Sequence, residues 1–181
     1  EHVSAQTVGD IFYPKVLAIG FDPQEVSGST TRSLAQTYFT MEGKTPEQFE
    51  DYVFNQRIDA FKQLSAGTIN YQIVQKIRVT RFPSYTNGFQ YTIDAFQNCK
   101  AGTPLPNGLT CEQQKWLFDN VAWIADNRIC ETANALGADE IWVMSAPFIM
   151  TYESFMIGPT TGFHVNGPTF VTPGCNKHLI V

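Results

Sequence analysis

Positive charge is scarce in this sequence. It has 12 lysines and arginines against 17 aspartates and glutamates, which gives a net charge of −5. No stretch of the chain concentrates basic residues, as nucleic-acid-binding and anionic-membrane-binding surfaces do. Apolar runs are also short, and none approaches the roughly 20 residues that a membrane-spanning helix needs. We therefore expect no nucleic acid and no membrane among the partners.

Familiar catalytic and cofactor motifs are missing as well. The chain contains no GxGxxG, no HExxH, no CxxC and no kinase signature. Ser145 has no Gly-x-Ser-x-Gly elbow around it, so a hydrolase nucleophile is not expected there. Any function has to be argued from single side chains and from where the fold places them.

Cysteine is uncommon, with four in the chain: Cys99, Cys111, Cys130 and Cys175. Cys99 and Cys111 bracket a Gly/Pro-rich loop of the kind that a disulfide closes well, and Cys130 and Cys175 could then form a second pair. Four buried thiols, as in many cytosolic proteins, are the alternative. The even number and the spacing favour disulfides, and with them a secreted, extracellular protein.

Apolar residues are plentiful, at 43% of a chain of 181, which suits one domain over residues 1–181. The runs KVLAIGF (residues 15–21) and EIWVMSAPF (residues 140–148) are typical of strands buried on both faces. A third run, residues 69–83, alternates apolar and polar residues but changes phase near Val74. This pattern predicts a strand with a bulge.

Two segments are predicted as helices. In residues 45–67, Thr45 and Gln48 can form a capping box, and apolar residues follow at helical spacing. The second helix is expected to run without interruption over about residues 111–136 and to bury an apolar stripe that ends at Leu136.

The predicted elements alternate between strand and helix along the chain. This order is typical of a layered α/β fold with a mainly parallel sheet flanked by helices. After Pro159 the sequence becomes rich in turn residues, so a turn-rich C-terminal segment is expected before the strand-like end KHLIV (residues 177–181).

Two carboxylates come after predicted strands: Asp22 follows the first, and Glu153 follows the Trp-containing one. Sites in parallel sheets form beyond the carboxyl ends of the strands. If these strands are neighbours, Asp22 and Glu153 would share a crevice, as catalytic acid and base or as ligands of a divalent metal ion. The alternatives are a turn residue before Pro23 for Asp22 and a solvated loop residue for Glu153.

Residues near Glu153 would complete such a site. Ser154 is a third catalytic candidate, expected to orient Glu153 through a hydrogen bond. Tyr152, Trp142 and His164 are candidates for substrate binding. A surface histidine without a functional part is the alternative for His164.

The block DEIWVMSAPFIMTYESFMIGP (residues 139–159) resembles a family of large, mostly secreted and uncharacterised microbial proteins. These share an Asp-Glu-aliphatic-Trp start, a Pro-aromatic pair, and Tyr/Trp-Glu-Ser before Met-x-Gly-Pro. Residues 21–23 (FDP) and 69–92 are similar to further family segments. Ser145-Ala146 departs from the Gly-Gly that is usual in the family.

The resemblance implies a secreted α/β domain and marks five positions for testing: Asp22, Asp139, Glu140, Glu153 and Ser154. It also implies a longer or processed protein, of which this chain would be the N-terminal part. A companion C-terminal chain would then pack against it.

These features favour a secreted hydrolase, metal-assisted or not, acting on a glycan or peptide-like substrate. One alternative is a non-catalytic module that binds carbohydrate or a cell surface through its aromatic residues, which make up 13% of the chain. Another is a structural chain of a processed precursor, associated with a companion chain or a second copy. A hydrolase requires Asp22 and Glu153 at one pocket, whereas a binding module requires an exposed group of aromatic rings.

Overall fold

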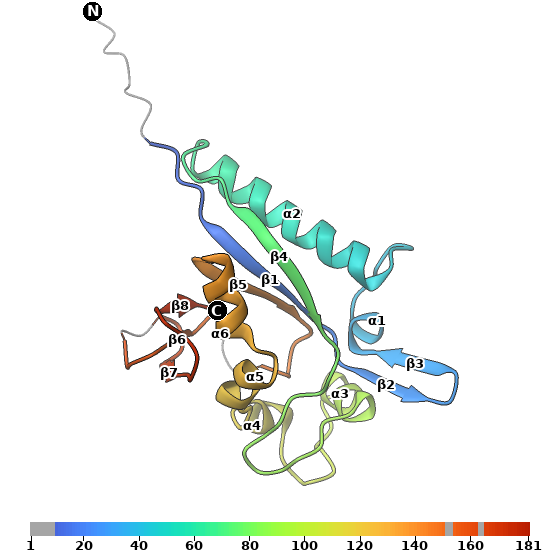
Figure 1. Cartoon of the computed structure of the whole chain (residues 1–181). Helices are drawn as coiled ribbons and strands as arrows, with labels where there is room; N and C mark the ends of the chain where they lie inside the picture. Colours follow the sequence, from blue (N-terminus) through green and yellow to red (C-terminus); the bar gives the residue numbers. More distant parts are fainter. Residues whose placement is uncertain (1–9, 151–153, 163–164) are drawn as a thin grey trace, which may run out of the picture.

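The computed structural model describes residues 10–150, 154–162 and 165–181 (Figure 1). Its strands are β1 (Lys15–Phe21), β2 (Gln24–Ser27), β3 (Thr30–Ser33), β4 (Gln72–Val79), β5 (Glu140–Ser145), β6 (Met156–Gly158), β7 (Thr169–Val171) and β8 (Leu179–Ile180). Its helices are α1 (Leu34–Tyr38), α2 (Pro46–Leu64), α3 (Ile93–Lys100), α4 (Cys111–Lys115), α5 (Asn120–Asp126) and α6 (Ile129–Leu136).

Six strands form the central sheet, in the order β4-β1-β5-β8-β6-β7. β1 pairs in parallel with both β4 and β5, β5 with β8, and β6 with β7, whereas β6 runs antiparallel to β8. β2 and β3 form a separate antiparallel hairpin. The predicted layered α/β fold with a mainly parallel sheet is confirmed.

Helices lie on both sides of β1 and β4, with α2 on one side and α4, α5 and α6 on the other (Figure 1). Strand geometry explains the difference between the two faces, because successive side chains point to opposite sides. Leu17, Ile19 and Phe21 belong to the main apolar core with residues of α3, α5 and α6. The alternate residues of β1 face α2, and the last of them is Gly20. Because Gly20 has no side chain, α2 can approach the strand closely at this point.

The predicted bulge is present in the pairing of β1 with β4. Val16 pairs with Ile73, but Leu17 pairs with Gln75, so Val74 is passed over in the ladder. Val74 is the extra residue of the bulge, and it coincides with the change of phase in the sequence.

The continuous helix expected over residues 111–136 is wrong: this segment forms the three short helices α4, α5 and α6. Side-chain caps interrupt it. Asp119 accepts from the backbone N–H of Ala122 at 2.9 Å, which starts α5. Arg128 adopts a left-handed conformation, with φ 51°, which a continuing helix does not allow.

The capping box of α2 is confirmed, but the buried side of the helix differs from its apolar pattern. Glu50 and Phe54 are its buried residues, whereas Tyr52 and Leu64 are 45% and 85% exposed. An ionisable residue, Glu50, is therefore buried in α2, which the apolar pattern of the sequence does not predict.

Both disulfides are confirmed, Cys99 with Cys111 and Cys130 with Cys175. The second joins α6 to the C-terminal segment, across 45 residues of sequence. Disulfides of this kind form and persist in oxidising compartments. Among the described helices, none has the length and apolar character to cross a membrane.

Candidate functional site

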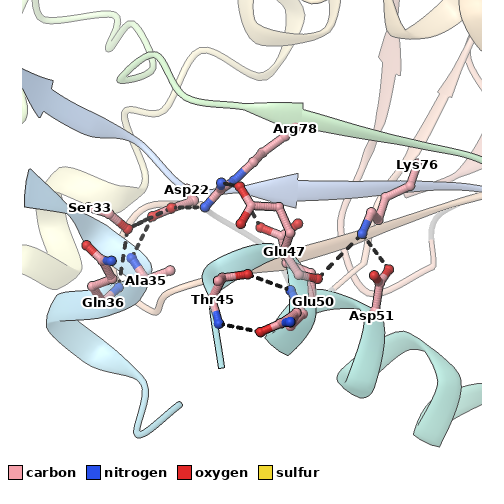
Figure 2. Close-up of polar contacts among 11 residues, drawn as sticks. Asp22, Ser33, Ala35, Gln36, Thr45, Glu47, Glu50, Asp51, Lys76 and Arg78 are labelled. Atoms are coloured by element: carbon pink, nitrogen blue, oxygen red, sulfur yellow. Dashed lines mark hydrogen bonds and ion pairs between the residues drawn. The ribbon is translucent and has the colours of Figure 1, made fainter. Parts of the chain in front are cut away.

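Asp22, directly after β1, is buried and fully engaged by hydrogen bonds. Its carboxylate accepts from the Ser33 hydroxyl at 2.6 and 2.7 Å and from the backbone N–H of Ala35 at 2.6 Å (Figure 2). The Arg78 guanidinium donates to its second oxygen at 2.5 Å. These contacts fix the start of α1 to the ends of β1 and β4.

Arg78 is the centre of a cluster that joins β4 to α2 (Figure 2). Its guanidinium forms ion pairs with Asp22, with Glu47 and, at 3.3 Å, with Glu50. Beside it, Lys76 forms an ion pair with Asp51 on the next turn of α2. The N-terminal half of α2 is thus tied to the sheet by charged groups. We refer to Asp22, Glu47, Glu50, Asp51, Lys76 and Arg78 as the carboxylate cluster.

Glu50 lies deepest in this cluster, with 0% of its surface exposed. Its carboxyl group packs on Gly20, where an added Cβ would approach to 2.3 Å. Gly20 pairs with Arg78 of β4 on one side and with Met144 of β5 on the other. Neither carboxyl oxygen of Glu50 has a hydrogen-bond partner among the described residues.

Burial raises the pKa of Glu50 from 4.5 to about 7. The nearby carboxylates of Asp22 and Asp51 act in the same direction, while Lys76 opposes them. Desolvation disfavours a charged carboxylate, and neighbouring negative charges add to that effect. Glu50 can therefore gain or lose a proton near neutral pH, unlike an ordinary surface glutamate.

A groove of about 690 Å³ runs between α2 and β5. Pockets for small ligands span roughly 300–1,000 Å³, so this one is of a suitable size. We call it the α2–β5 groove. Its lining is mostly apolar and includes Val53, Phe54, Arg57 and Phe61 of α2, all of β5, residues 146–148, and Met150, Ser154, Phe155, Ile180 and Val181.

Two aromatic residues that line one part of the groove, Phe61 and Trp142, form a cluster with Tyr71, which packs against both but does not line the groove. Tyr71 and Trp142 have ring centroids 4.7 Å apart, and Phe61 lies 5.2 Å from Tyr71 and 5.8 Å from Trp142. Glu140 accepts hydrogen bonds from the Tyr71 hydroxyl and the Trp142 indole N–H, both at 2.9 Å. We call Phe61, Tyr71, Trp142 and Glu140 the aromatic end of the groove.

The hydrogen bonds at the aromatic end fix the orientation of the Glu140 carboxylate. Burial, and then the bond to Glu140, raise the pKa of Tyr71 to about 12, so its hydroxyl stays a donor at physiological pH. A carboxylate with two accepted bonds retains lone pairs for further donors, such as ligand hydroxyl groups. The aromatic end combines a flat apolar surface with an oriented acceptor.

The carboxylate cluster adjoins the opposite part of the groove. Glu50 lies one turn before Phe54 on α2, and Phe54 lines the groove. Met144, the partner of Gly20 in β5, lines it too.

The expected adjacency of the first and the Trp-containing strands is confirmed, since Phe21 of β1 pairs with Ser145 of β5. Trp142 and Ser154 both line the α2–β5 groove. Asp22 does not line it and is engaged instead in the carboxylate cluster. The remaining candidates, Tyr152, Glu153 and His164, lie outside the described residues, so a shared crevice for Asp22 and Glu153 stays a prediction.

No group of three or more His, Cys, Asp or Glu side chains suited to a metal ion occurs within residues 10–150, 154–162 and 165–181. The oxygens of Asp22 already accept from Ser33, Ala35 and Arg78. A divalent metal ion held by Asp22 and Glu153 remains a prediction.

Sequence reasoning missed Glu50 and Arg78. One signal was available: Gly20 interrupts an otherwise apolar strand, and a glycine inside a strand often marks close approach by another group. Nothing in the sequence indicated that the approaching group is a carboxyl from α2. Glu140, by contrast, was marked through the resemblance, and it does line the groove.

Comparisons with protein-family models, with curated proteins and with solved structures found no match.

Proposed function

We propose that this chain is a secreted protein that binds a glycan in the α2–β5 groove. The aromatic end carries the proposal: Phe61 and Trp142, supported by Tyr71 behind them, offer an apolar surface beside the oriented carboxylate of Glu140. Sugars present apolar ring faces together with hydroxyl donors at their edges. Aromatic stacking and a carboxylate acceptor suit both properties at once.

Three further observations support the proposal. Phe61 is 37% exposed, so the rings are not sealed inside the core. The groove continues past the aromatic end along β5, which leaves room for more than one sugar unit. The two disulfides agree with an oxidising, extracellular environment, where glycan ligands are abundant.

Titration calorimetry with neutral β-linked oligosaccharides of two to six sugar units tests the proposal. The Trp142→Ala variant should lose about 5- to 150-fold in affinity, since stacking of one ring contributes about 1–3 kcal/mol by analogy with base stacking. Trp116→Ala is the matched control, because Trp116 is 51% exposed and does not line the groove. Absence of binding by the unmodified protein, or an equal loss in both variants, would contradict glycan binding in the groove.

Hydrolysis is the second candidate, and the position of Ser154 favours it. Ser154 lines the groove and directly follows Glu153 in sequence. In this proposal Glu153 is the catalytic acid or base, Ser154 orients it, and Tyr152 and His164 contact the substrate. Asp22 holds the adjoining loop in place, or shares a divalent metal ion with Glu153.

Release of reducing ends from the same oligosaccharides measures hydrolysis. Glu153→Gln keeps the shape of the side chain and removes its charge, so it should abolish release while leaving affinity within a few fold. A chelator separates metal-assisted from metal-free hydrolysis. If Glu153→Gln retains full activity, Glu153 is not the catalytic acid or base. If the unmodified protein releases no reducing ends, glycan binding alone remains.

Association with a companion C-terminal chain, or with a second copy of this chain, is proposed on the resemblance alone. Light scattering on this 181-residue chain would give twice its mass of 20.3 kDa for a second copy, and mass spectrometry of the protein from its natural source would detect a further polypeptide for a companion chain.

A further inference from the structure

Glu50 places a buried carboxyl group on α2, the helix that forms one wall of the groove. We propose that Glu50 is a proton-operated latch: protonated, it holds the N-terminal half of α2 against the sheet, and ionised, it releases that half and opens the α2–β5 groove. The effect on ligand binding rests on the proposed function. The movement of α2 does not, so the two can be tested separately.

The latch depends on the space around Glu50. The side chain is completely buried, its carboxyl packs against the backbone of Gly20, and neither oxygen has a hydrogen-bond partner among the described residues. A neutral carboxylic acid is tolerated in such a place much better than a carboxylate, which loses its hydration. Ionisation therefore favours any movement that returns the carboxyl to water.

Positive charge near Glu50 is already engaged by other carboxylates. Arg78, on β4, lies 3.3 Å from Glu50 but also pairs with Asp22 and Glu47. Lys76, on the same strand, pairs with Asp51. The β5 residue that pairs with Gly20 is Met144, which carries no charge.

Counting the carboxylate cluster shows the imbalance. It contains four carboxyl groups (Asp22, Glu47, Glu50 and Asp51) and two cations (Lys76 and Arg78). With every carboxyl ionised the cluster carries two excess negative charges, and a proton on Glu50 reduces this to one. The proton therefore relieves repulsion as well as desolvation.

Release of α2 would reach the groove because the same face of the helix forms its wall. Glu50 is followed at helical spacing by Phe54, Arg57 and Phe61, all of which line the groove. Glu50 and Phe54 are the buried residues of α2, so loss of the Glu50 contact removes one of these two buried contacts and leaves the half-exposed ion pairs of Glu47 and Asp51 to hold this half of the helix. Moving the helix outward widens the gap between Phe54 and β5.

Amide hydrogen exchange of the ligand-free protein, read by mass spectrometry at pH 5.5 and pH 8, tests the latch. After correction for intrinsic rates, the opening equilibrium of α2 should rise by up to about 30-fold, as expected if the pKa of Glu50 falls from about 7 to 4.5 on opening. Peptides from α6, on the other side of the sheet, report global unfolding, which also depends on Glu50, so local release of α2 should appear as an opening equilibrium of α2 that exceeds that of α6 at pH 8.

Two variants keep the test decisive. Glu50→Gln cannot ionise, so its α2 should exchange equally at both pH values; Glu50→Met is the substitute if the amide variant does not fold. Equal corrected exchange of α2 at both pH values in the unmodified protein overturns the latch, as does a pH effect that survives in Glu50→Gln.

Oligosaccharide affinity at the two pH values separates the latch from the proposed function. A rise in α2 exchange without any glycan binding leaves the latch standing and removes the proposed ligand. Glycan binding together with pH-independent exchange of α2 supports the proposed function and rules out the latch.

Discussion

The carboxyl group of Glu50 occupies the space that a side chain at position 20 would fill. A Cβ added to Gly20 would lie 2.3 Å from the carboxyl carbon of Glu50, which is too close for either group to remain in place. The relationship joins the middle of the sheet to α2 and explains why a glycine is found inside β1. It also makes the two positions dependent on one another.

Gly20→Ala should therefore destabilise the protein, by about 1–3 kcal/mol, as overpacking of a closely packed interior does. In a Glu50→Ala background the same change should be neutral or stabilising, because the space is then free and alanine suits a strand better than glycine. Urea denaturation of the two single variants and the double variant measures the coupling. Additive effects would show that the two side chains do not compete for one space.

The stability of the fold should depend on pH through Glu50. Its folded-state pKa of about 7 exceeds 4.5, so the proton favours the folded state. This contribution is complete below pH 4.5 and is lost as the pH rises through 7, and it amounts to at most about 3 kcal/mol. The free energy of unfolding should fall between pH 5 and pH 7.5 in the unmodified protein and fall less in Glu50→Gln.

Asp139 does not disturb that comparison. Its pKa is lowered, first by the backbone N–H of Lys15, which donates to it, and further by Lys177. The stabilisation that comes with a lowered carboxyl pKa is fully present at pH values above the ordinary pKa of 3.8. It is lost as the pH falls through the lowered pKa. That loss lies below the range in which Glu50 titrates.

Asp22→Asn should cost about 3 kcal/mol, because it removes one partner of a buried ion pair and leaves the Arg78 guanidinium with less compensation. The carboxylate of Asp22 is 1% exposed and accepts from Ser33, Ala35 and Arg78. Glu47→Gln is the matched control, since Glu47 pairs with the same guanidinium but its side chain is 54% exposed. The control should cost no more than about 1 kcal/mol, as for other exposed pairs. An equal loss of free energy of unfolding in Asp22→Asn and Glu47→Gln, measured by thermal or urea denaturation, would contradict the structural role assigned to Asp22.

The disulfides should contribute unequally to stability. In the chain-entropy description, a closed loop of 12 residues contributes about 3 kcal/mol and one of 45 residues about 4 kcal/mol. Replacing Cys130 and Cys175 together by serine should therefore destabilise the protein more than replacing Cys99 and Cys111. Denaturation of the two double variants measures the difference, and peptide mapping without reduction verifies the pairing.

Local patterns in the sequence were sufficient for much of the fold. Thr45 and Gln48 specify the start of α2 through side chains three residues apart, and the phase change at Val74 specifies a bulge. Each depends on neighbours in the chain, and so the sequence reveals it directly. The wrong prediction of one helix over residues 111–136 also has local causes. The side chain of Asp119 caps the start of α5, and the left-handed backbone of Arg128 separates α5 from α6, so the apolar periodicity did not give one continuous helix.

The alternation of strands and helices, and the presence of disulfides, could be predicted from local patterns in the chain. The pairing of the four cysteines and the contacts between distant side chains come from the packing of the elements. Glu50 and Gly20 are thirty residues apart in the printed sequence, and Arg78 reaches both α2 and the loop after β1. The carboxylate cluster is assembled by the packing of α2 on the sheet. A contact between two distant segments depends on how they pack, so it cannot be predicted from the pattern of residues within either segment.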